Sequence, residues 1–345
     1  MNPVPFFTRL HIALQRLVRW EFWPWRVVYL PVAVYWFYLA IRARGWVYFS
    51  AANPCMRFGG LITYSKWDIL KPVPQELRPR TIIIDIETEI DHVFDEIEMQ
   101  KMVFPLIIKP DMGERGKGVE ILQNEAELRN ALQTVSETMM LQTFEKLPVE
   151  LGILYSRHPD EEMGTISSVV VKEFPTPTGD GKRSLLQLIL SNQRTRLNYK
   201  AIIERLQNRW NEVPADGEVV EVVKLGNHML GTTFIDGNHL INNKLLEVFD
   251  TLAKKLDGFF IGRFGVRTSS IEELEKGNFK VIEVNGAGSE PAHIYDPNMP
   301  LWKGLHALFA QWKRMYEISV ANHKNGAPYG SFREIRAEIK RHHVQ

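Results

Sequence analysis

The chain has 345 residues, of which 45% are apolar and 24% charged, with a formal net charge of +1. A chain of this length and composition can bury a sizeable core and divide into two domains or lobes. The near-zero net charge excludes a general electrostatic attraction to nucleic acid. The single cysteine, Cys55, excludes an intrachain disulfide and suits a reducing, cytosolic environment.

The first fifty residues are apolar, aromatic and basic. They contain six arginines, no lysine and one acid, Glu21, and they hold five of the nine tryptophans. Upstream of residue 22, apolar residues recur at helical spacing with arginines between them, as in a helix that lies at a bilayer surface. We therefore expect 1–60 to be a membrane-associating helical segment. Through 1–50 it would attach the protein peripherally to the cytoplasmic face of a membrane, where ATP is available.

Two alternatives remain open for 22–41. This stretch could pack as a helical hairpin on the rest of the protein or on a second subunit, or it could span the bilayer. The longest uncharged apolar run, 27–41, has fifteen residues, whereas a spanning helix needs about 20. A secretory signal peptide does not fit, because the run is rich in aromatic residues and no small-residue cleavage pattern follows it.

Glycine and proline are frequent between 53 and 81, which predicts a linker with one short helix. Beyond it the pattern is mixed α and β. Strands are predicted at 81–86, 104–109, 118–122, 138–144, 149–155, 164–174, 259–267 and 279–285, and helices at 87–102, 124–132, 185–193 and 244–256. Amphipathic helices and a basic tail are predicted for 301–345.

A glycine-rich loop follows the strand that ends in Lys109. Gly113, Gly116 and Gly118 lie within six residues, and such a loop lets backbone N–H groups approach a phosphate closely. The P-loop pattern is absent, because no Gly-Lys-Ser/Thr opens a helix here. Without further context, the three glycines could simply form a tight turn.

Glu283 and Asn285 end a late apolar strand. They are two residues apart, so their side chains are expected on the same face. A carboxylate and an amide oxygen in this position are suitable Mg²⁺ ligands, and magnesium usually shares its ligands with nucleotide phosphates. Taken alone, such a pair is more commonly an ordinary strand exit.

The order of these motifs resembles the ATP-grasp superfamily, most closely the D-alanine–D-alanine ligase and cyanophycin-synthetase-like branches. The resemblance extends from about 65 to 297. It implies an α+β ATP-grasp fold, in which two α/β lobes clasp ATP, preceded by the apolar, arginine-rich helical segment. The ATP-grasp domain would occupy 61–300, with lobes at about 80–145 and 146–300, before C-terminal helices and a basic tail at 301–345.

The resemblance also implies an activity and its cofactors. The cofactors would be ATP and Mg²⁺ (or Mn²⁺). The enzyme would be an ATP-dependent ligase that joins a carboxylate to an amine or a thiol through an acyl phosphate. Neither substrate can be named from the sequence, and the apolar segment suggests that one of them is lipid-linked or amphipathic. No nucleic-acid partner is expected, and the oligomeric state is left open.

Roles at individual positions follow from the same resemblance. Lys66 and Lys109 would hold phosphates under the glycine loop, 141–144 would form the adenine hinge, and Glu150 would bind the ribose. Arg263 would steady a negatively charged intermediate, Glu283 and Asn285 would bind metal, and the loop after them would receive the amine. The implied nucleotide-binding set is Lys66, Lys109, Gly113, Arg115, Gly116, Gly118, Leu141, Gln142, Thr143, Phe144, Glu150 and Lys172; the implied substrate set is Gly286, Gly288 and Ser289.

Two features depart from the resembled pattern. Gly265 stands where an aspartate would normally bind the first magnesium. This departure suggests an alternative, an ATP-binding protein with weak or no ligase activity. The usual N-terminal α/β domain is also replaced by the apolar segment, so nothing about the carboxylate substrate can be inferred from the resemblance.

Overall fold

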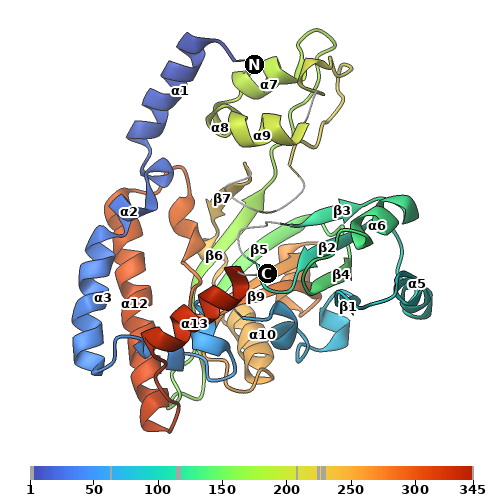
Figure 1. Cartoon of the computed structure of the whole chain (residues 1–345). Coiled ribbons are helices and arrows are strands. Elements are labelled where there is room, and N and C mark those ends of the chain that lie inside the picture. Colours follow the sequence, from blue (N-terminus) through green and yellow to red (C-terminus); the bar gives the residue numbers. More distant parts are fainter. Residues whose placement is uncertain are drawn as a thin grey trace.

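The computed structural model describes residues 4–62, 64–113, 118–206, 209–223, 226 and 231–343. It has a mixed α+β architecture with two antiparallel sheets, and a helical segment precedes them (Figure 1). The predicted class and the predicted N-terminal helices are therefore present. The domain boundaries at 60 and 300 stay predictions.

The smaller sheet has the strand order β1-β4-β2-β3. Helices α5 and α6 pack against it through Val93 and Leu128, which share one core with Leu106 and Ile108 of the central strand β2. Asn124 begins α6 by accepting a hydrogen bond from the Glu127 N–H. The elements are β1 (Thr81–Ile84), α5 (Ile90–Met99), β2 (Leu106–Pro110), β3 (Glu120–Leu122), α6 (Glu125–Leu132) and β4 (Met139–Thr143).

The larger sheet has the order β7-β6-β5-β8-β9. Its core includes three phenylalanine rings, and Phe249 of α10 lies 5.3 Å from Phe279 and 5.6 Å from Phe264 between ring centroids. The elements are β5 (Val149–Ser156), β6 (Thr165–Glu173), β7 (Thr233–Asp236), α10 (Asn243–Lys254), β8 (Ile261–Thr268), α11 (Ile271–Glu275) and β9 (Phe279–Asn285).

Three short helices are inserted between β6 and β7. They are α7 (Leu185–Ser191), α8 (Gln193–Leu197) and α9 (Tyr199–Leu206). Ser184 and Gln187 form a capping box that begins α7. Ile12 of α1 (Phe6–Val18) joins the apolar core of these helices, so the insertion and the N-terminal segment share one apolar cluster.

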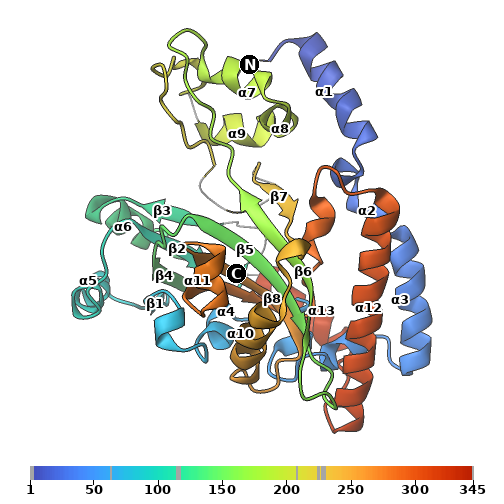
Figure 2. The same cartoon turned by 180° about the vertical axis from the view of Figure 1, so that it is seen from behind.

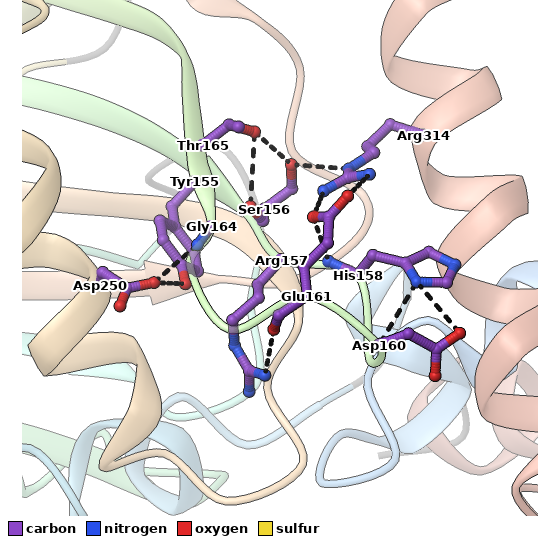
Figure 3. A network of polar contacts seen from close by, with 10 residues as sticks. All are labelled: Tyr155, Ser156, Arg157, His158, Asp160, Glu161, Gly164, Thr165, Asp250 and Arg314. Atoms are coloured by element: carbon purple, nitrogen blue, oxygen red, sulfur yellow. Dashed lines mark hydrogen bonds and ion pairs between the residues drawn. The ribbon is translucent and has the colours of Figure 1, made fainter.

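The turn between β5 and β6 is fastened to two helices (Figure 3). Asp250 of α10 accepts hydrogen bonds from the Tyr155 hydroxyl at 2.6 Å and from the Gly164 N–H at 2.8 Å. Arg314 of α12 (Leu301–Lys324) forms an ion pair with Glu161 in the turn. These contacts hold the end of the larger sheet at the β5–β6 turn against α10 and α12.

The N-terminal segment forms α1 (Phe6–Val18), α2 (Trp25–Val28) and α3 (Leu30–Ala43). Helix α3 lies alongside α12 (Leu301–Lys324), and its residues Leu39 and Ala40 share a core with Met315 and Ile318 (Figures 1 and 2). One face of 22–41 therefore packs on the rest of the protein, as one of the alternatives predicted. In the part of the chain that the structure describes, no helix is both long and apolar enough to cross a membrane.

Residues 53–62 are not the linker that the sequence predicted. Asn53 is fully buried. Its side chain donates to the carbonyls of Gly59 and Ile261 and accepts from the N–H groups of Phe260 and Ile261. The predicted short helix is present as α4 (Lys66–Leu70). The glycines here permit close packing of the backbone and do not make the segment flexible.

At the C-terminal end, α12 is followed by helix α13 (Phe332–His343).

Candidate functional site

Four cationic side chains surround the Glu283 carboxylate. Burial raises the pKa of Glu283, but the charges of these four groups lower it below its usual value. Glu283 is therefore ionised at neutral pH, and four positive charges act on it, of which Lys172 is also paired with Glu150. The four are Lys172 of β6, Arg263 of β8, Lys109 of β2 and Lys66 of α4. Both sheets thus contribute to a site with an excess of positive charge.

Lys109 is half-buried at the end of β2. Its Nζ donates to the Ile282 carbonyl at 3.1 Å, which links the smaller sheet to β9. Burial lowers the pKa of Lys109 to about 8, although the nearby Glu283 charge acts in the opposite direction. An added anion would stabilise the charged form of this lysine.

Lys66 lies at the base of the glycine loop. Its Nζ donates to the carbonyls of Pro110 and Asp111 at 2.7 and 3.1 Å. A Cβ placed on Gly113 would lie 3.5 Å from the same Nζ. Gly118, at the other end of the loop, has a φ of +66°, the left-handed conformation that favours glycine. The candidates Arg115 and Gly116 lie outside the described residues.

Glu150 forms an ion triad across three neighbouring strands. It is paired in register with Lys172 on β6 and with Arg267 on β8. Its oxygens lie 2.7 Å from Lys172 Nζ and 2.6 Å from Arg267 Nη2. Burial raises the pKa of Glu150, but these two charges lower it below its usual value. Ribose binding by Glu150 stays a prediction, and a ribose would have to compete with these partners.

Arg267 was not among the candidates from the sequence. Its guanidinium lies 5.3 Å from the ring centroid of Phe144 and 5.6 Å from that of Phe174, and it donates to the Glu145 carbonyl at 2.6 Å. It therefore connects the end of the predicted hinge to the larger sheet. The signal was a second arginine on the same strand as Arg263, but its partner could not be identified without the strand register.

The predicted adenine hinge 141–144 forms the end of β4 and the residue after it. Leu141 belongs to the core of the smaller sheet, and the buried Gln142 donates from its side chain to Thr81 Oγ1 at 2.9 Å. The N–H groups of Thr143 and Phe144 donate to carbonyls of Arg80 and Pro105, respectively. These two N–H groups already donate hydrogen bonds within the protein, so an adenine would have to bind to other polar groups of the hinge.

The predicted metal ligands Glu283 and Asn285 lie on β9, opposite Gly265 and Arg263 of β8. A Cβ on Gly265 would lie 2.5 Å from Glu283 Cγ, so Glu283 fills the space that a larger residue at 265 would need. Asn285 Oδ1 accepts a hydrogen bond from the Tyr64 hydroxyl at 2.9 Å. No group of three or more His, Cys, Asp or Glu side chains suited to a metal occurs among the described residues. The two oxygens fit magnesium if phosphates supply further ligands.

The predicted substrate loop is held by backbone pairing with residues 59–60. The N–H groups of Ala287 and Gly288 donate to the carbonyls of Gly59 and Gly60 at 3.0 and 3.2 Å. A Cβ on Gly286 would lie 2.7 Å from the Gly60 Cα, so this approach requires glycine. The remaining candidate, Ser289, donates from its hydroxyl to the Asn285 carbonyl at 3.1 Å.

Glu290, directly after this loop, receives a contact from the N-terminal segment. The hydroxyls of Tyr29 and Tyr295 both donate to its carboxylate. Burial, together with the Glu290 charge, raises the pKa of Tyr29, so its phenol stays protonated and can donate. This contact could not be predicted from the sequence, because Tyr29 and Glu290 are 261 residues apart.

Comparison with known proteins gives structural matches to ATP-grasp enzymes. A D-alanine–D-alanine ligase from Bacillus anthracis is 17% identical over 76% of this chain and 69% of its own, with a TM-score of 0.42. The VanG D-Ala:D-Ser ligase from Enterococcus faecalis is 14% identical over 72% of this chain and 61% of its own, with a TM-score of 0.42.

A bifunctional glutathione synthetase from Pasteurella multocida is 15% identical over 71% of this chain, with a TM-score of 0.37. The chain spans 36% of the length of that protein. No family model and no curated protein matches the chain. Identity and TM-score are low in every case, so the function has to be inferred from the site's own residues.

Proposed function

We propose that the protein is an ATP-dependent ligase that joins a carboxylate to an amine or a thiol through an acyl phosphate. The observation that supports this best is that the charges of Lys66, Lys109 and Arg263 all act on Glu283, with Lys66 Nζ bonded to the carbonyls of Pro110 and Asp111. Several cations around one carboxylate suit a polyanion such as a nucleoside triphosphate. Lys66 and Lys109 would hold its phosphates, with the loop 111–118 above them.

In the first step, a carboxylate oxygen of the substrate attacks the γ-phosphorus. The bond from the γ-phosphorus to the bridging oxygen breaks, and ADP leaves. In the second step, the amine nitrogen attacks the acyl carbon, the bond to the phosphate oxygen breaks, and phosphate and a proton leave. The protein supplies no covalent nucleophile in this scheme. Lys109 and Arg263 would position the reactants and neutralise the developing charge.

Magnesium would be held by Glu283 and Asn285 together with nucleotide phosphates, and it would neutralise phosphate charge. The carboxylate of Glu283 is ionised, as a metal ligand must be. Manganese would suit the same oxygen donors.

One substrate is proposed to be lipid-linked or amphipathic. The support is the contact between Tyr29, in the apolar N-terminal segment, and Glu290, next to the predicted amine-binding loop. If the loop after β9 receives the amine, this contact would bring the apolar N-terminal segment close to the second substrate.

One observation favours an alternative, an ATP-binding protein with weak or no ligase activity. Gly265 supplies no carboxylate, and Glu283 occupies the adjoining space. The two functions are distinguished by ADP release from ATP and Mg²⁺ in the presence of cell lipid or amino-acid extracts. The ligase predicts release that an extract stimulates, whereas the alternative predicts nucleotide binding without it.

The nucleotide site itself is tested with Lys109→Met. ATP and Mg²⁺ at about one hundred times Kd should stabilise the wild type by about 2.7 kcal/mol, and Lys109→Met should lose most of this stabilisation. Lys276→Met is the matched control, because the Lys276 side chain is 64% exposed on α11's C-terminal side. Equal stabilisation of wild type and Lys109→Met would show that the nucleotide binds elsewhere.

A further inference from the structure

Helix α1 exposes an apolar face to solvent. Its exposed apolar side chains are spaced three or four residues apart and therefore lie on one side of the helix. They are Phe7, Leu10, Leu14, Leu17 and Val18. Phe7 and Val18 are 81% and 85% exposed to solvent. On the opposite side, Ile12 is buried in the cluster that contains α7 to α9. The fold thus holds α1 by one face and leaves its apolar face uncovered.

Helix α3 has the same arrangement. Val32, Leu39 and Ala40 are buried toward α12 and its surroundings. The opposite face exposes apolar residues at helical spacing, namely Leu30, Val34, Phe37, Tyr38 and Ile41. Helices α1 and α3 follow one another along one side of the molecule (Figures 1 and 2). We call the exposed apolar residues of these two helices the outer flank. Exposed apolar surface of this extent on a folded protein marks an interaction site.

Within 4–50, the exposed charges of the outer flank's own segment have one sign. Arg9, Arg26, Arg42 and Arg44 are all exposed. The one acid of this segment, Glu21, has a side chain that is 4% exposed and forms an ion pair with Arg194 at 2.8 Å. The exposed ionised side chains that 4–50 contribute are therefore positive. Two such surfaces would repel each other, which disfavours a second copy of this chain as the partner.

We propose that the outer flank docks on an anionic phospholipid bilayer, with α1 and α3 lying in the plane of the interface. Their apolar faces would enter the boundary between headgroups and acyl chains, and the arginines would contact lipid phosphates. Trp25 and Trp46, exposed by 63% and 48%, are of the residue type that favours the headgroup level. Apolar burial combined with basic residues is sufficient for stable attachment.

The test is flotation of the full-length protein with vesicles of phosphatidylcholine alone or mixed with phosphatidylglycerol. The protein should float with the anionic vesicles and less so at high salt. Leu14→Glu combined with Phe37→Glu should weaken vesicle binding by about tenfold or more, because both apolar contacts are lost. Arg42→Gln combined with Arg44→Gln should weaken binding to the anionic vesicles and leave the weak binding to phosphatidylcholine unchanged.

The matched control is Ile86→Glu combined with Val103→Glu, two apolar residues that are 64% and 71% exposed outside the outer flank. Vesicle binding of this variant should equal that of the wild type. The proposal is overturned if the wild type does not float, or if the control loses as much binding as the flank variant. It is also overturned if the flank variant only converts a dimer to a monomer in sedimentation. Because no nucleotide is used, these outcomes are independent of the proposed ligase activity.

Discussion

Lys109 is a half-buried lysine whose charged form is disfavoured by its surroundings. Its pKa is lowered to about 8, chiefly by burial. The unfolded chain, with an ordinary lysine pKa near 10.4, therefore binds this proton more tightly. Because the unfolded chain binds more protons between about pH 8 and 10.4, the contribution of Lys109 to the free energy of unfolding increases as pH rises through this range. A group that costs stability in its charged form at neutral pH is a strong candidate for a functional role.

We predict that nucleotide affinity falls as pH rises above about 8. A bound phosphate would restore the charge of Lys109, so binding takes up one proton in this range, and Kd should rise by up to about tenfold per pH unit. Calorimetry in two buffers of different ionisation enthalpy measures the proton uptake. Lys109→Met should abolish it. Uptake that persists in Lys109→Met would assign the proton to another group of the site.

Gly265 illustrates what a residue type can and cannot predict. The sequence suggested a vacant ligand position, because glycine replaced a carboxylate. The structure instead has Glu283 packed against the Gly265 Cα, so close that a Cβ would lie 2.5 Å from Glu283 Cγ. The glycine is explained by this packing, which depends on the pairing of β8 with β9. Pairing of strands from separate segments was not available from one sequence.

At the scale of elements, the turn Trp20–Phe22 that follows α1 is attached to the insertion by a buried ion pair. Glu21 and Arg194 lie 2.8 Å apart, with side chains 4% and 15% exposed. We predict that Glu21→Gln lowers the free energy of unfolding by about 2 kcal/mol, because it leaves the Arg194 charge poorly compensated. Proteolytic cleavage of α1 should also accelerate. Chemical denaturation and limited proteolysis measure the two effects.

Glu125→Gln is the control for this prediction. The pair of Glu125 with Arg129 is also 2.8 Å long, but its side chains are 59% and 45% exposed. An exposed pair four residues apart on a helix contributes about 0.5 kcal/mol or less. Equal destabilisation by both substitutions would contradict the structural role assigned to Glu21.

The sequence predicted the principal strands and helices of both sheets, because their apolar residues follow strand or helix periodicity and caps such as Asn124 mark the ends. It did not predict α8, α9 or β7. These elements are short, at five, eight and four residues, and depend on contacts with α1 and β6. The linker prediction for 53–81 was wrong at 53–62, since glycine content does not distinguish a flexible segment from close backbone packing.

At the scale of the whole molecule, Tyr29 connects the outer flank's helices to the loop that follows β9. We predict that Tyr29→Phe increases amide hydrogen exchange in 286–296 by about tenfold, because Glu290 loses one of two phenol donors. Tyr38→Phe is the control, since the Tyr38 hydroxyl is exposed and accepts from Arg42 at 3.3 Å. Unchanged exchange in Tyr29→Phe would mean that the N-terminal segment does not support this loop.

The candidate site could be assembled from the sequence in part. Lys66, Lys109, Lys172, Arg263 and Glu283 were recognised from the order of motifs, and the structure brings them together. Three other residues were missed: Arg267, Tyr29 and Glu290. Arg267 depends on the register of β5 with β8, and the other two are brought together across most of the chain. The order of motifs along the chain predicts which residues are candidates for a site. The strand register and the tertiary packing determine which of these residues contact one another.

The contact between Gly60 and Gly286 has a consequence for which substitutions the protein can accept. Each position faces backbone atoms of the other, with a Cβ-to-Cα separation of 2.7 or 2.8 Å. A larger residue at one cannot be offset by a smaller one at the other, because both are already the smallest possible. In a saturation mutagenesis experiment both positions should therefore reject every side chain, with no compensating second change. At Gly181 an added Cβ would meet nothing closer than 3.6 Å, but φ is +66°. This position should therefore accept asparagine, which tolerates the left-handed conformation, and reject β-branched residues.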